Sequence, residues 1–346
     1  MKKHAIIPIF IPHEGCPNDC VFCNQKKITA RQAPVHAEDV RRIIEEYLPT
    51  ITNRGIETIE VAFFGGSFTG IPMEEQSEYL AVAKEYKDKG YIDKIHLSTR
   101  PDYISEEILG NLKFYGVDVI ELGVQSFDEE VLQASNRGHS SEIVYKSCDM
   151  IKKYGFELGI QLMIGLPQDT KEKSIYSAME TVKIGPAIAR LYPTVIIDDT
   201  ELLNMYNRGE YKALSQDEAV ETTKEMYKIL TSAGINVIRV GLKSTDIINE
   251  NGAVTGGTYH PAFRQLVEGA IAREMLENIL KESINRIPEK ITFESCGASF
   301  SNMVGNNKCN KLYFSEKYPQ LNIKFAVNNE LEEGKYVVNF EERRAR

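Results

Sequence analysis

The segment His13-Glu-Gly-Cys16-Pro-Asn-Asp-Cys20-Val-Phe-Cys23-Asn-Gln25 carries three cysteines within eight residues, with the spacing C-x3-C-x2-C. It follows residues 5–10, an apolar stretch that the pattern predicts to be a buried first strand. Three thiolates on one short loop can hold three irons of a four-iron, four-sulfur (4Fe-4S) cluster and leave the fourth iron open to another ligand. The sequence therefore predicts an iron-sulfur site formed by Cys16, Cys20 and Cys23.

Two other interpretations of these cysteines stay open at this stage. Zinc takes four ligands in tetrahedral geometry, and His13 could be the fourth, although zinc sites usually carry a second ligand pair well downstream and none is evident. Three unrelated buried cysteines are the last alternative. The other cysteines, Cys148, Cys296 and Cys309, are scattered along the chain, and we expect packing or reactive roles for them.

Outward from the cysteines, strands and helices alternate through six units. The expected strands are residues 5–10, 58–64, 94–98, 117–123, 157–164 and 189–194. The expected helices between them are residues 37–51, 73–87, 105–114, 141–154 and 171–184, with Ser105 as an N-cap. Mostly apolar strands that alternate with helices indicate a parallel sheet with both faces covered. We therefore predict an α/β fold, either an open sheet or a partial (β/α)6 barrel of the TIM type.

The pattern changes after residue 195. The expected elements there are a helix over 215–233, a strand over 235–240, turns over 252–261, a long helix over 262–281 and a small α+β unit at the end. We predict three parts: a partial barrel over residues 1–200, an extension of that barrel over 201–257, and a small α+β C-terminal domain over 258–346.

Polar residues and glycines follow the predicted strands, whose carboxyl ends meet at one edge of a parallel sheet. The candidates for cofactor contact are Gly65, Gly66, Ser67, Ser98, Arg100, Gln125, Arg137 and Gly165 at these strand ends, with Phe22 and Gln25 in the cysteine segment itself. A glycine pair lets backbone groups approach a ligand closely. A guanidinium such as that of Arg137 can bind a carboxylate bidentately. Arg100 is expected either to face this pocket or to pair with Asp102.

The chain is acidic overall, with 41 Lys and Arg against 50 Asp and Glu and a net charge of −9. This balance excludes a uniformly basic, nucleic-acid-binding surface. The charge is uneven, however, because residues 258–346 carry 13 basic and 12 acidic side chains, so any nucleic-acid contact is expected there or in a local patch. No apolar run approaches the ~20 residues of a membrane span. Clustered cysteines favour metal over disulfides, and we expect a cytoplasmic protein.

With these motifs the chain resembles the radical S-adenosylmethionine (SAM) superfamily. Residues 121–139 and 191–212 resemble the radical SAM domain of the Elongator catalytic subunit, and the Gly-Val-Gln-Ser and Gly-Leu-Pro pieces are shared with oxygen-independent coproporphyrinogen oxidases. The resemblance implies a partial (β/α)6 radical SAM barrel, a 4Fe-4S cluster whose open iron binds SAM, and cleavage of SAM to methionine and a 5′-deoxyadenosyl radical. It also implies an electron donor such as flavodoxin or ferredoxin. The implied SAM contacts run from Gly65 and Gly66 to the amino group, from Gln125 and Ser126 to the ribose, from Arg137 to the carboxylate and from Gly165 to the adenine.

The same resemblance implies an RNA substrate, because the Elongator subunit modifies the wobble uridine of transfer RNA with acetyl-CoA held by an acetyltransferase domain. Only about 100 residues follow residue 240 here, without a Gln/Arg-x-x-Gly-x-Gly pyrophosphate loop, so we expect that domain to be absent. Residues 304–325, with Gly305-Asn-Asn-Lys308, loosely resemble a KH domain, whose GXXG loop clamps nucleotide backbone; the alternative is a structural cap. We expect RNA modification. The alternatives are action on a small molecule or peptide, and a non-catalytic iron-sulfur or RNA-binding module.

Overall fold

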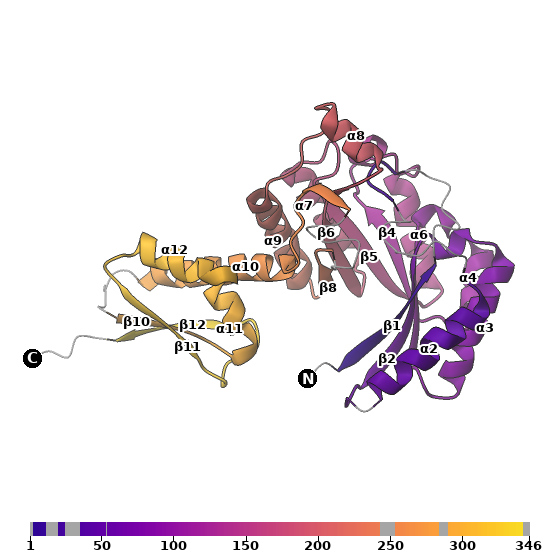
Figure 1. Ribbon diagram of the computed structural model, residues 1–346, viewed down its shortest axis with the longest axis horizontal. Coiled ribbons are helices and arrows are strands. Elements are labelled where there is room, and N and C mark those ends of the chain that lie inside the picture. The colour runs from indigo at the N-terminus through magenta and orange to yellow at the C-terminus, as the bar shows by residue number, and fades with distance from the viewer. Residues whose placement is uncertain are drawn as a thin grey trace, which may run out of the picture. The chain divides into compact units, whose positions relative to one another are not determined.

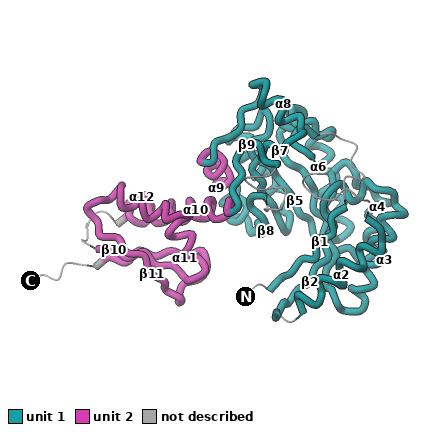
Figure 2. The backbone as a smooth tube through the Cα atoms, in the orientation of Figure 1, with its two compact units in different colours: residues 1–216, 226–261 teal, residues 217–225, 262–346 magenta. Residues whose placement is uncertain are grey.

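The computed structural model describes residues 3–11, 20–24, 35–52, 54–242, 253–283 and 290–341. The chain divides into two compact units, one formed by residues 1–216 and 226–261 and the other by residues 217–225 and 262–346 (Figure 2). Each unit is described by itself. The expected subdivision at residues 200 and 257 stays a prediction.

The first unit is built on a sheet of seven parallel strands in the order β1-β2-β3-β4-β5-β6-β8. These strands are β1 (His4–Ile11), β2 (Thr58–Gly65), β3 (Lys94–Thr99), β4 (Val119–Gln125), β5 (Glu157–Ile164), β6 (Ile188–Pro193) and β8 (Asn236–Val240). The helices between them are α2 (Ala37–Ile51), α3 (Met73–Asp88), α4 (Glu106–Phe114), α5 (Glu129–Ala134), α6 (Ser141–Lys153), α7 (Lys171–Ile184) and α8 (Glu201–Asn207). Helix α9 (Gln216–Ser232) precedes β8 in the chain, and its residues 217–225 belong to the second unit. The sheet curls, with helices along its outer side, which confirms the predicted partial barrel and extends it by one strand (Figure 1).

Local signals fix where these helices begin and end. Ser105, the predicted N-cap of α4, accepts a hydrogen bond of 3.2 Å from the backbone N–H of Ile108. Asp128 and Thr170 cap α5 and α7 in the same way. Each such cap satisfies a backbone donor that the first helical turn leaves open, which contributes about 1 kcal/mol.

The two faces of the barrel sheet differ in character because successive side chains on a strand point to opposite faces. The face that packs on the helices is apolar and fully buried, and it includes Val61, Phe63, Ile95, Leu97, Ile120, Leu122, Ile160 and Leu162. Burial of each such side chain stabilises the fold by about 1.5–3 kcal/mol. The concave face instead carries charged residues, among them Glu60, His96, Glu121 and Arg190. The apolar strands predicted from sequence thus hold a polar interior.

A small antiparallel pair, β7 (Val195–Ile197) with β9 (Val254–Gly257), lies beyond the end of β6. The turns expected over residues 252–261 therefore contain a short strand. Gly257 allows this pairing, because a Cβ at that position would lie 2.9 Å from the carbonyl oxygen of Thr194. The side chains of Val195 and Ile197 pack with Ala253 in a small buried cluster.

The second unit contains α10 (Phe263–Ser283), β10 (Lys290–Ser295), α11 (Gly297–Val304), α12 (Cys309–Lys317), β11 (Asn322–Val327) and β12 (Tyr336–Glu341). Its sheet has the order β11-β10-β12, with β11 parallel and β12 antiparallel to β10. The helices cover one face, where Leu276, Phe293, Met303 and Phe314 form a core of their own. This arrangement confirms the small α+β unit predicted for the end of the chain. Within the residues that are described, no helix is both long and apolar enough to cross a membrane.

Candidate functional site

The cysteine loop is held at the carboxyl ends of the barrel strands by residues distant in the chain. The backbone N–H of Val21 donates to the Ser135 carbonyl at 3.2 Å, and the Val21 carbonyl accepts from Leu202 N–H at 2.7 Å. Cys23 N–H donates to the Cys20 carbonyl at 3.0 Å, which closes a tight turn between the two thiols. These contacts fix Cys20 and Cys23 at the strand ends. Cys16 and Gln25 lie outside the described residues.

Side chains of the same loop pack into a small apolar cluster. Val21 contacts Ile196, Leu202 and Tyr211, and Phe22 packs partly buried against this group. Phe22 thus has a packing role in the structure, and its expected contact with a cofactor stays a prediction.

Arg100 and Arg137, both predicted site residues, lie together at the sulfur of Cys20. Arg137 Nη1 is 3.1 Å from Cys20 Sγ, and Arg100 Nη1 is 3.8 Å from it. Both guanidinium groups are buried, with 5% and 4% of each residue exposed. Cationic donors at these distances suit an anionic sulfur, because a thiolate is the form that ligates metal.

Further hydrogen bonds hold the two guanidiniums in place. Arg100 donates through Nε and Nη2 to Asp102 at 2.9 Å each, so Arg100 pairs with Asp102 and also reaches the pocket. Its Nη2 donates to the Arg137 carbonyl at 2.5 Å, and Arg137 Nη2 donates to the Gly123 carbonyl at 2.5 Å. Among the described residues, two buried cations lie beside one carboxylate, so Arg100, Arg137 and Asp102 together carry one net positive charge, which suits a thiolate or another anion.

The pKa of His139 is lowered by burial and by these cations. It lies two residues after Arg137 and is buried. Burial, together with the positive charge of Arg137, lowers the pKa of His139 to about 4. The segment over residues 129–143, which includes Arg137 and His139, also borders an open hollow of about 450 Å³. Sequence analysis assigned no role to His139, whose neighbours depend on the folded chain.

The glycine pair at the end of β2 is required by the close approach of β1. Gly65 has a φ of +114°, and a Cβ there would lie 2.3 Å from the carbonyl oxygen of Ile11 at the end of β1. Gly66 N–H donates to the same carbonyl at 3.1 Å. Only glycine tolerates this approach. The pair therefore brings the strand that enters the cysteine segment against the loop after β2.

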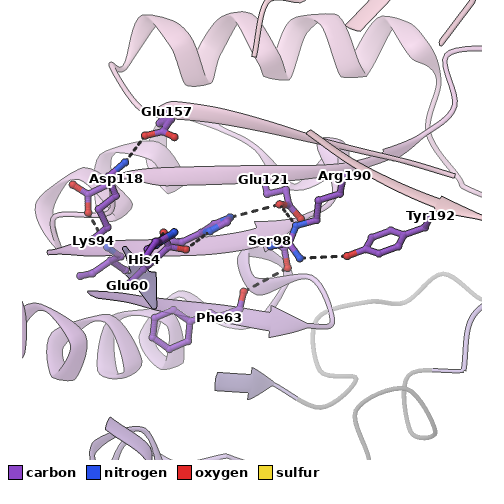
Figure 3. Close-up of polar contacts among 12 residues, drawn as sticks. His4, Glu60, Phe63, Lys94, Ser98, Asp118, Glu121, Glu157, Arg190 and Tyr192 are labelled. Carbon is purple, nitrogen blue, oxygen red and sulfur yellow. Dashed lines mark hydrogen bonds and ion pairs between the residues drawn. The ribbon is translucent and has the colours of Figure 1, made fainter. Parts of the chain in front are cut away.

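The hydroxyl of Ser67 links the loops after β2 and β3. Ser67 Oγ lies 2.8 Å from Thr99 Oγ1 and accepts from Arg100 N–H at 3.2 Å. The residue is 2% exposed, so it positions the Arg100 loop. Ser98 points to the concave face and lies 3.4 Å from the Phe63 carbonyl (Figure 3).

Gln125 stands at an irregular end of β4. Its φ is +72°, and the register of β4 against β5 shifts between Gly123 and Gln125. Its Oε1 accepts from Gln161 Nε2 at 3.2 Å. Positive φ at a non-glycine residue costs of order 1–3 kcal/mol and is common at functional sites. Ser126 Oγ accepts from Asp128 N–H at 3.1 Å and lies 3.3 Å from Ser177 Oγ, and its expected contact with the SAM ribose stays a prediction.

Gly165 ends β5 with a φ of +79° and packs directly against Leu214, whose Cδ1 would lie 2.8 Å from a Cβ at this position. Its carbonyl accepts from the Tyr211 hydroxyl at 2.6 Å. Since Tyr211 also contacts Val21, Gly165 is joined to the cysteine loop. The described site residues thus gather around that loop, with Ser98 on the concave face.

The barrel interior holds a network of charged side chains that the sequence did not predict (Figure 3). His96 Nδ1 lies 2.6 Å from Glu60 Oε1, and Arg190 Nε donates to Glu121 at 2.6 Å. Arg190 Nη1 lies 3.3 Å from the Tyr192 hydroxyl. Although burial alone would raise it, hydrogen bonds from His4 and His96 hold the pKa of Glu60 at about 2. The available signal was a charged or titratable residue inside four of the otherwise apolar strands: Glu60, His96, Glu121 and Arg190.

Comparison with known proteins identifies the first unit. Residues 10–177 match the radical SAM superfamily, and residues 186–273 match a radical SAM C-terminal domain. The chain belongs to the radical SAM superfamily. Enzymes of this superfamily bind a 4Fe-4S cluster and SAM. The Cys20 sulfur, which faces two buried guanidiniums, fits such an anionic cluster, and Cys20 and Cys23 would hold it together with Cys16.

Individual relatives share the barrel region. The chain is 31% identical over 256 residues to the tRNA uridine(34) acetyltransferase of Methanocaldococcus infernus. This match covers 63% of this chain and 48% of the relative. The chain is 29% identical over 225 residues to the heme chaperone HemW of Lactococcus lactis, covering 64% and 58%. The archaeal Elp3 structure from M. infernus superposes with a TM-score of 0.59 at 21% identity, covering 83% and 64%. The chain spans about half the length of the curated tRNA uridine(34) acetyltransferases it matches.

Proposed function

We propose that this radical SAM enzyme modifies RNA. One observation carries the proposal: 63% of the chain is 31% identical to a relative named for a transfer-RNA uridine. When bound, the cluster and SAM supply a 5′-deoxyadenosyl radical once an electron arrives. We further propose a cytoplasmic location and a flavodoxin or ferredoxin as the electron donor.

The chain's own residues would divide the work as follows. Cys16, Cys20 and Cys23 hold the cluster, while the guanidiniums of Arg100 and Arg137 donate to it and balance its charge. The remaining site residues are proposed to seat SAM: Phe22, Gln25, Gly65, Gly66, Ser67, Ser98, Gln125 and Gly165, with Arg137 also near the SAM carboxylate. The substrate would lie on the concave face, where Arg190 and Tyr192 are partly exposed.

Loss of the gene tests the substrate class. Transfer RNA from a deletion strain, digested to nucleosides and analysed by mass spectrometry, should lack one modified nucleoside, and a plasmid copy should restore it. A plasmid copy with Cys20→Ala should not restore it, whereas Cys309→Ala, a change at an exposed cysteine, should. An unchanged nucleoside profile in the deletion strain would sink the RNA proposal.

A second candidate is action on a small molecule or peptide. The net charge of −9 favours it, because an acidic surface repels polyanions. Anaerobically reconstituted protein distinguishes the two candidates. Release of 5′-deoxyadenosine that rises with added transfer RNA supports RNA modification, whereas release indifferent to RNA but stimulated by a low-molecular-weight cell extract supports the second candidate.

A further inference from the structure

The C-terminal unit carries a groove that the radical chemistry does not use. A hollow of about 410 Å³ lies between the loop after α11, helix α12 and strand β11. Its lining residues are Asn307, Lys308, Lys311, Leu312, Ser315, Leu321, Asn322, Ile323 and Phe325. Two of these nine residues are lysines and none is acidic. The groove is therefore basic in a chain whose net charge is −9.

The two groove lysines differ from other lysines of this unit. Lys281 and Lys317 form ion pairs with Glu277, and Lys335 forms one with Glu332. Across the part of the chain that is described, neither Lys308 nor Lys311 has an ion pair or a side-chain hydrogen bond. Their charges are thus left for a ligand, and two ammonium groups one helical turn apart suit successive phosphates.

The backbone at the mouth of the groove turns sharply into a helix. Asn307 and Lys308 have φ values of +50° and +62°, and α12 begins at the next residue, Cys309. Within this turn Lys308 N–H donates to the Gly305 carbonyl at 3.0 Å and Cys309 N–H donates to the Asn306 carbonyl, so the open backbone donors are those of the first turn of α12. Gly305 lets the chain turn into this loop, because a Cβ there would lie 2.6 Å from the Cys309 sulfur.

The other wall of the groove is apolar and ends at an open strand edge. Leu312, on this wall, is 55% exposed. Ile323 and Phe325 lie on the same face of β11, partly buried against the core of the unit. Strand β11 is at the edge of its sheet and pairs only with β10 among the described strands, so its outer backbone groups can meet base edges or another chain.

We infer that this groove binds single-stranded RNA, with phosphates at Asn307, Lys308 and Lys311 and bases against Leu312, Ile323 and the β11 edge. Unpaired lysines favour a polyanion over the main alternative, a peptide strand added to β11. A duplex does not fit, because its bases are stacked and cannot reach an apolar wall. The choice of RNA rests on the proposed function, whereas the binding site itself does not require that any radical reaction occur.

Fluorescence anisotropy with the full-length, cluster-loaded protein and a labelled single-stranded RNA of mixed sequence tests the inference. Lys308→Glu/Lys311→Glu should weaken binding at least tenfold at 50 mM salt. It should also lower the slope of log Kd against log salt by about 1.4, since each lost phosphate contact removes ~0.7. Leu312→Ser should weaken binding about threefold without changing the slope. The matched control is Lys281→Glu/Lys335→Glu, which changes the net charge equally at two exposed lysines of the same unit that lie outside both the groove and β11.

Three results would overturn the inference. The wild-type protein does not bind the RNA, or the control and groove variants lose the same amount of RNA affinity. The third is that an alternating Glu-Val octapeptide binds more tightly than RNA and its binding depends on Lys308 and Lys311. Failure of the groove and failure of the proposed function remain distinguishable. If the groove variant binds RNA normally while the deletion strain lacks a modified nucleoside, only the groove fails. If the groove variant loses RNA binding while nucleosides are unchanged, only the proposed reaction fails.

Discussion

The Arg137 guanidinium donates to the sulfur of Cys20 at 3.1 Å, although 117 positions separate the two residues. The contact joins the cysteine loop to the segment after β4, and Arg137 is itself anchored by the Gly123 carbonyl. Because a cluster held by thiolates is anionic, a fixed cation at this place both orients a ligand and stabilises the cluster's charge. We therefore propose that Arg137 is a positioning residue for the cluster site.

Replacement of Arg137 tests this role. Arg137→Met removes the charge and both donors, and a hydrogen bond to a charged group contributes about 1.5–3 kcal/mol. We expect the iron and sulfide content after anaerobic reconstitution to fall several-fold and the cluster to be lost faster under a chelator. Arg137→Lys should recover part of the iron content, because it keeps the charge without the planar donor geometry.

The control is Arg208→Met, at an exposed arginine that pairs with Glu201 and Glu210. It should reconstitute like the wild-type protein. Equal iron content in Arg137→Met and in wild type would show that the guanidinium does not support the cluster.

Gly65 offers a second prediction, on stability. Gly65→Ala places a Cβ 2.3 Å from the Ile11 carbonyl oxygen at a φ of +114°, so strands β1 and β2 must move apart. Gly90→Ala is the matched control, since Gly90 also has a positive φ, of +74°, but no atom lies within 4 Å of its Cβ position. Urea unfolding should show that Gly65→Ala costs about 1–3 kcal/mol more than Gly90→Ala, the range expected for overpacking. Equal costs would mean that only backbone strain matters there.

Much of this architecture was predictable because its signals are local. Alternating apolar strands and capped helices specified the barrel, and three cysteines on one loop indicated the superfamily, while the ligand set itself stays a prediction. The position of Arg100 and Arg137 at one sulfur was not predictable, since it depends on which loops the sheet order brings together. The orientation of Ser126 depends on Ser177 in α7, far along the chain. The charged concave face was not predicted either, because each strand contributes only one or two charged residues to it and is otherwise apolar.

The acidic side of that network predicts a pH dependence. The pKa of Glu60 is about 2 in the folded protein against 4.5 ordinarily, so the unfolded state binds the proton first as the pH falls. The Glu60 carboxylate therefore adds about 3 kcal/mol to the free energy of unfolding above pH ~4.5. This contribution is lost as the pH falls from ~4.5 to ~2. Glu60→Gln should be less stable at neutral pH and lose less stability over this acidic range, measured by urea unfolding at each pH. Glu57→Gln, at an exposed glutamate paired with Lys3, should keep the wild-type profile.

The pair formed by Glu121 and Arg190 predicts non-additive mutations. Arg190 Nε lies 2.6 Å from Glu121, whose side chain is 3% exposed, and the guanidinium also covers the Phe64 ring at 4.9 Å. Arg190→Met leaves the buried Glu121 carboxylate with only the more distant His96 Nε2, at 3.8 Å, which should cost about 3 kcal/mol of unfolding free energy. Glu121→Gln added to Arg190→Met removes the uncompensated charge, so the double variant should be more stable than Arg190→Met alone. If the double variant is as unstable as the single one, the cost comes from lost packing on Phe64, and the ion pair has no net role in holding the concave face.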